Sequence, residues 1–118
     1  MTVEMFSPRW YYRGTLPDDN QKQIIDAFDI FLSEDKNFSN RDEWNCNVLT
    51  TYQSPHNDEA PWSVFLEMMR PVIDEFMESM RPKIDLTIKP QEGWANKYLK
   101  GQYQEHHCHS VPFCNLAL

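Results

Sequence analysis

The chain has 118 residues and a mass of 14.1 kDa, enough for one domain with a modest core and too little for two. Eighteen acidic and eleven basic side chains give a formal net charge of −7, which argues against nucleic acid as a partner because its backbone is also negative. No apolar segment approaches the roughly 20 residues that span a bilayer, and the first residues lack the pattern of a secretory leader, so no membrane contact is expected.

The first predicted element is a helix that begins after Pro17 and extends to about residue 33. Asp18 and Asp19 complement the positive end of a helix dipole. Apolar residues follow at spacings of three and four, which predicts one face packed on a core: Ile24, Ile25, Phe28, Phe31 and Leu32.

A second helix is predicted between about residues 62 and 81, where another apolar stripe runs from Trp62 to Met80. Pro71 lies inside it and removes one backbone hydrogen bond, so we expect one bent helix or two abutting helices.

Strands are predicted mainly after the helices. A short strand is expected in 48–54, a half-buried strand in 83–89 from the alternation of Ile84, Leu86 and Ile88, and another in 94–99. A turn follows at Lys100 and Gly101, and two further extended pieces reach residue 118. The expected class is therefore α+β, with N-terminal helices packed on a sheet, in a single domain over 1–118.

Histidines concentrate in the segment 101–110, which reads GQYQEHHCHS. Successive side chains of a strand face opposite ways, so His107 and His109 share one side while His106 and Cys108 project to the other. Two neutral imidazoles on one side can hold Zn²⁺ or Fe²⁺, so His107 and His109 are the predicted metal ligands. Glu105 shares their side but lies about 13 Å from His109 in a straight strand.

The run GWANKYLKGQYQEHHCHSVPFCNLAL resembles the 2-oxoglutarate/Fe(II) oxygenase-like family, in which a Trp-Asn strand and a glycine turn precede an H-x-H segment. The order of the upstream elements is also similar over most of the chain. The resemblance implies a double-stranded β-helix (jelly roll), Fe(II) and 2-oxoglutarate as cofactors, and His107 as the first metal ligand. Asn96 and Tyr98 face one side of the preceding strand and are candidate cofactor-binding residues.

The chain departs from that family at three points. His109 stands where the common motif has a carboxylate, no histidine follows it, and no arginine or lysine follows Lys100. We therefore expect the domain to be incomplete at its C-terminus and the chain alone to be catalytically inactive. The cupin pattern G-x5-H-x-H also fits Gly101, His107 and His109, but Phe113 and Cys114 stand where cupins have a glutamate.

Two functions remain open. The leading one is a 2-oxoglutarate/Fe(II)-dependent oxygenase-like protein with a metal-binding H-x-H strand. The alternative is a non-catalytic binding or assembly module, or a cupin-like metal-binding protein, of the same fold. In either case the unfinished apolar strand VPFCNLAL predicts a homo-oligomer through its edge. The odd number of cysteines, three, suits a reducing compartment and predicts a cytoplasmic location.

Overall fold

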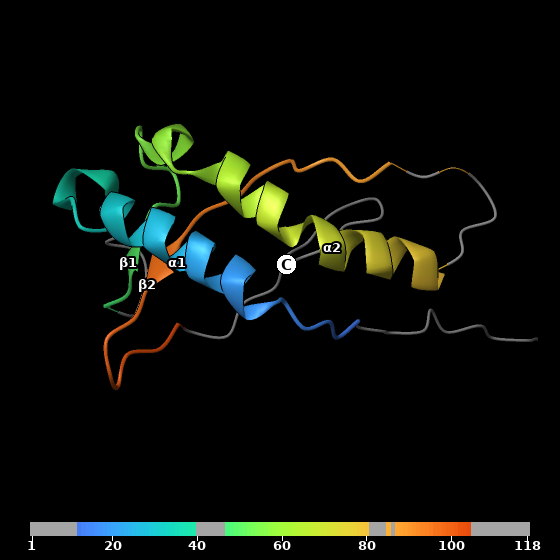
Figure 1. Cartoon of the computed structure of the whole chain (residues 1–118). Helices are drawn as coiled ribbons and strands as arrows, with labels where there is room; N and C mark the ends of the chain where they lie inside the picture. The colour runs from blue at the N-terminus through green and yellow to red at the C-terminus, as the bar shows by residue number, and fades with distance from the viewer. Residues whose placement is uncertain (1–11, 40–46, 81–84, 86, 105–118) are drawn as a thin grey trace, which may run out of the picture.

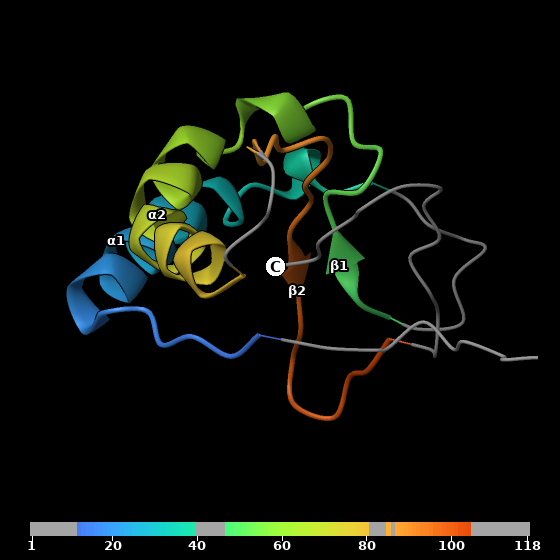
Figure 2. The ribbon, with the colours of Figure 1, turned by 90° about the vertical axis from the view of Figure 1, so that its right-hand side faces the viewer.

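Two helices and a small antiparallel sheet make up the described part of the chain. The computed structural model describes residues 12–39, 47–80, 85 and 87–104. The elements occur in this order: α1 (Asp18–Phe31), 3-10 turn η1 (Asp35–Asn37), β1 (Leu49–Thr50), 3-10 turn η2 (Asn57–Glu59), α2 (Trp62–Met80) and β2 (Asn96–Lys97). The helices run antiparallel side by side, and the sheet lies next to them (Figures 1 and 2). The α+β class is confirmed.

Helix α1 begins at Asp18, in the acid-rich segment where the sequence predicted its start. The N–H of Gln21 donates to the Pro17 carbonyl at 3.0 Å, and Asp18 and Asp19 occupy the first turn. Phe28 is buried, but Ile25 is 55% exposed, so the predicted apolar face was one residue too wide. Each residue of a helix is rotated by about 100° from the one before it. Ile25 therefore lies to the side of Ile24, towards solvent.

Helix α2 continues through Pro71 as a single helix, and the alternative of two abutting helices is excluded. Its Trp62 ring packs on Phe28 of α1 with ring centroids 5.2 Å apart, and the Asn20 side chain donates to the Met68 carbonyl at 2.9 Å. Within the described residues, neither helix has the length and apolar character needed to cross a membrane.

The segment before α1 lies against the second half of α2. The Tyr12 ring contacts Phe76, which is buried, with centroids 5.5 Å apart. A Cβ atom at Gly14 would come within 2.9 Å of Val72 Cγ1, so this glycine permits a close approach to α2. The helix pair is therefore covered at this end by its own N-terminal segment.

The sheet is smaller than the sequence predicted. Leu49 pairs with Lys97 and Thr50 with Asn96, and the N–H of Thr51 donates to the Ala95 carbonyl at 2.9 Å. The strand predicted in 94–99 is thus confirmed over two residues, and the short strand predicted in 48–54 is present.

The strand predicted in 83–89 is wrong for its described residues. Asp85 and residues 87–89 are exposed and have no strand geometry, whereas Lys83, Ile84 and Leu86 lie outside the described residues. Alternating apolar residues form a strand only if another strand accepts their backbone hydrogen bonds, and β1 is paired with β2 instead.

Candidate functional site

A hydrogen-bonded junction holds β2 in place. The hydroxyl of Thr51, which is 0% exposed, donates to Asn57 Oδ1 at 2.7 Å and accepts from the Ala95 N–H at 2.8 Å. Asn57 Nδ2 donates to the Gly93 carbonyl at 2.7 Å. The segment 51–57 is thereby joined to residues 93–95, 36 to 44 residues further along the chain, immediately before Asn96.

The same junction is tied to the start of α2. The indole N–H of Trp62 donates to the Asn57 carbonyl at 2.7 Å. A Cβ atom at Gly93 would lie 3.3 Å from the Trp62 ring, so a glycine lets the backbone approach the ring closely. The residues that precede β2 are therefore fixed from both sides.

The two candidate cofactor-binding residues differ in their surroundings. Asn96 is half-buried, and its Oδ1 atom is buried without a hydrogen-bond partner among the described residues. Tyr98 is 47% exposed, and its hydroxyl donates to Gln104 Oε1 at 3.2 Å. Buried polar atoms without a partner are uncommon, so Asn96 is the better candidate for a ligand contact.

A rigid turn separates β2 from the histidine segment. Gln102 N–H donates to the Leu99 carbonyl at 3.0 Å, and Leu99 N–H donates to Gln102 Oε1 at 2.8 Å. Gly101 has φ +85°, in the left-handed region that favours glycine. The turn predicted at Lys100 and Gly101 is confirmed.

Gly101→Ala is expected to lower the free energy of unfolding by about 1 kcal/mol, since a side chain is strained at positive φ even though nothing lies near its Cβ. Chemical denaturation would measure the loss, with Lys100→Ala as the control in the same turn. If the Gly101→Ala and Lys100→Ala variants were equally stable, the positive φ of residue 101 would not be a source of strain.

The predicted metal ligands His107 and His109 lie outside the described residues, as do Glu105, His106 and Cys108. The structure therefore neither brings them together nor separates them. Within the part of the chain that is described, no group of three or more His, Cys, Asp or Glu side chains is arranged to hold a metal ion.

The remaining histidine, His56, is half-buried, and its Nδ1 lies 3.1 Å from Glu59 Oε1. The hydrogen bond with His56 lowers the pKa of the Glu59 carboxyl below its ordinary value. Glu59 is therefore ionised at neutral pH and contributes a negative charge to its surroundings.

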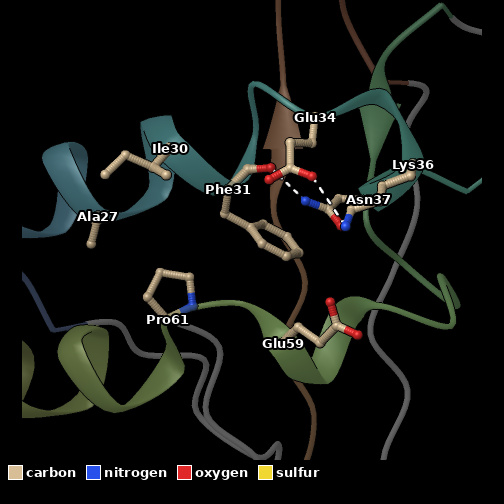
Figure 3. A pocket seen from close by; sticks show the side chains of 8 residues that line it. All are labelled: Ala27, Ile30, Phe31, Glu34, Lys36, Asn37, Glu59 and Pro61. Carbon is tan, nitrogen blue, oxygen red and sulfur yellow. Dashed lines mark hydrogen bonds and ion pairs between the residues drawn. The ribbon is translucent and has the colours of Figure 1, made fainter.

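A hollow that no sequence pattern indicates lies between the end of α1 and the start of α2 (Figure 3). Its volume is about 450 Å³, and its apolar wall consists of Ala27, Ile30, Phe31 and Pro61. Its polar rim consists of Glu34, Lys36, Asn37 and Glu59. No periodicity marks these residues because they come from four separate elements and turns.

Asn37 is the unusual member of this rim. Its side chain is almost fully buried, with the residue 2% exposed, and its Nδ2 donates to the Phe31 carbonyl at 2.7 Å at the end of α1. Its Oδ1 atom is buried without a hydrogen-bond partner. This acceptor lies behind the rim of the hollow, and no donor among the described residues satisfies it.

Comparison with protein family models, with curated proteins and with solved structures found no match.

Proposed function

We propose that the chain is a 2-oxoglutarate/Fe(II) oxygenase-like protein in which His107 and His109 hold the metal. The observation that carries the proposal is the H-x-H spacing directly after the glycine turn at Gly101, in the order found in that family. In an extended segment this spacing puts both imidazoles on one side, where they can share an ion.

The donor set suits the proposed metal. Imidazole nitrogen is a good ligand for Fe²⁺ and also for Zn²⁺, and two histidines are common to many non-haem iron sites. Bound iron together with 2-oxoglutarate would supply the activation of O₂. Asn96 and Tyr98 would contribute to the cofactor pocket, and the buried, unpartnered Oδ1 of Asn96 supports a contact there.

The proposed fold is a partial jelly roll whose sheet continues from the described strands. The antiparallel pairing of β1 with β2, anchored through Thr51 and Asn57, supports this extension. We further propose that the domain belongs to the cytoplasm, because its odd number of cysteines suits a reducing compartment.

The ligand assignment predicts a difference between neighbouring histidines. His107→Ala should weaken Co²⁺ or Fe²⁺ binding by about tenfold or more. Loss of a group that only orients a metal ligand already lowers metal affinity by about 10–100-fold, and loss of the ligand itself should lower it at least as much. His106→Ala, the matched control on the opposite side, should leave the affinity within about twofold. Binding by the wild-type chain should also weaken as the pH falls through about 6.5, because a protonated imidazole cannot coordinate.

Metal titrations followed by calorimetry or by the visible absorption of Co²⁺ would measure these affinities. Undiminished binding by His107→Ala would contradict its assignment as a ligand. Equal losses in the two variants would mean that the segment does not alternate as a strand.

A non-catalytic assembly module is the second candidate function. Exposed apolar side chains near the sheet favour it, since large apolar groups at a surface often mark interaction sites. They include Leu49, Tyr98, Leu99 and Tyr103. Oligomerisation through the apolar edge of 111–118 remains a prediction from the sequence.

A further inference from the structure

The turn after β2 forms a basic and apolar tip on an acidic protein. We define the tip as residues 97–103, KYLKGQY, which contain two lysines and no acidic residue. Leu99 is 61% exposed and Tyr103 is 67% exposed. Neither Lys97 nor Lys100 has an ion-pair partner among the described residues.

The tip has a defined shape. The reciprocal hydrogen bonds between Leu99 and Gln102 and the positive φ of Gly101 hold the turn in one conformation. A preorganised loop loses less conformational entropy on binding than a flexible one. The exposed Leu99 side chain is therefore presented from a rigid support, between two cationic groups.

The hollow at the end of α1 has complementary properties. Its apolar wall includes Ile30, which is 73% exposed, and the half-buried Phe31 ring, which points into the space between α1 and η2 (Figure 3). The segments 34–37 and 56–59 that border it carry four carboxylates and one lysine. Lys36 already pairs with Glu34 at 3.1 Å, but an exposed pair of this kind is worth only about 0–1 kcal/mol and is easily rearranged.

The two surfaces cannot meet within one chain. β2 leaves the junction near η2 and carries the tip to the opposite end of the sheet from η1 and η2 (Figure 2). Each molecule therefore presents one basic, apolar tip and one acidic, apolar hollow, pointing in different directions.

We propose that the tip of one copy docks into the hollow of a second copy, with Leu99 against Ile30 and Phe31. Lys97 and Lys100 face the carboxylates of Glu34 and Glu59 at the rim of the hollow. The contact is head-to-tail, so it joins copies into a ring or an open chain. It uses neither the H-x-H segment nor residues 111–118 and goes beyond the functions proposed above.

Charge reversal tests the pairing. The variant Lys97→Glu/Lys100→Glu and the variant Glu34→Lys/Glu59→Lys should each weaken self-association by about tenfold or more, because like charges then face each other. An equimolar mixture of the two variants should associate again, since each tip then meets a hollow of opposite charge.

Sedimentation equilibrium would measure the association constants, with circular dichroism as a check on folding. Matched controls reverse exposed charges elsewhere: Arg70→Glu/Lys89→Glu for the tip, and Glu67→Lys/Glu78→Lys for the hollow. A wild-type chain that stays monomeric up to millimolar concentration would overturn the proposal. So would association that is unchanged in both variants, or a mixture that associates no better than either variant alone.

Discussion

Thr51→Val is expected to lower the free energy of unfolding by about 3 kcal/mol. Valine has nearly the shape of threonine, so the buried site stays filled and only the hydroxyl is lost. That hydroxyl donates to Asn57 Oδ1 at 2.7 Å and accepts from the Ala95 N–H at 2.8 Å. Each buried group left without a partner costs about 1–3 kcal/mol, and the substitution leaves two.

Urea denaturation of the full chain would measure this loss. Thr50→Val is a graded comparison, because Thr50 is also buried and, among the described residues, its hydroxyl accepts one hydrogen bond, from the Tyr52 N–H at 3.1 Å. Thr15→Val provides an exposed control. A Thr51→Val chain as stable as the Thr15→Val chain would mean that the junction does not hold β2 in place.

Pro71→Ala is expected to have the opposite effect and to raise the free energy of unfolding by about 2 kcal/mol. Proline in a helix interior is about 3 kcal/mol less favourable than alanine, because its ring has no N–H to donate and crowds the preceding turn. Proline also restricts the unfolded chain, which stabilises the folded state by about 0.4–1 kcal/mol and offsets part of this difference. Pro71 is exposed, so the substitution removes little packing.

The midpoint of thermal or chemical unfolding would show the gain. Pro90→Ala serves as the control because Pro90 is exposed and lies outside both helices. A Pro71→Ala chain that is less stable than the wild type would indicate that the proline ring makes a contact that α2 needs.

Local patterns were sufficient to predict the helices. The spacing of Ile24, Phe28 and Phe31 and the acidic first turn located α1, and the stripe from Trp62 to Met80 located α2. Pro71 left open a break in the second helix, but α2 is continuous through this proline and packs against α1. Helices can be predicted in this way because their hydrogen bonds are local.

The sheet was harder to predict because strand pairing depends on distant residues. The alternation in 83–89 predicted a strand, yet Ile88 and its described neighbours are exposed and do not form a strand. β1 and β2 are short, and the side chains of Thr51 and Asn57 add hydrogen bonds to residues 93–95. Their pairing joins residues more than forty positions apart, which no local pattern indicates.

The hollow could not have been predicted from the sequence either. Asn37 stands in a polar stretch that predicts a solvated loop, but the fold buries it against the end of α1. The wall and rim come together only because α1 and α2 pack antiparallel. The histidine segment is the reverse case: its pattern is clear in the sequence, and it lies outside the described residues.

Binding of 2-oxoglutarate to the metal-loaded chain bears most directly on the oxygenase-like proposal. Calorimetric titration of 2-oxoglutarate should give a binding signal with the Co²⁺-loaded wild-type chain, no signal without metal, and no signal with His107→Ala under the same metal concentration. This result is expected because, under the proposal, the cofactor would chelate a metal held by His107 and His109. Binding that is equally strong without metal, or no binding to the loaded wild-type chain, would contradict the proposal.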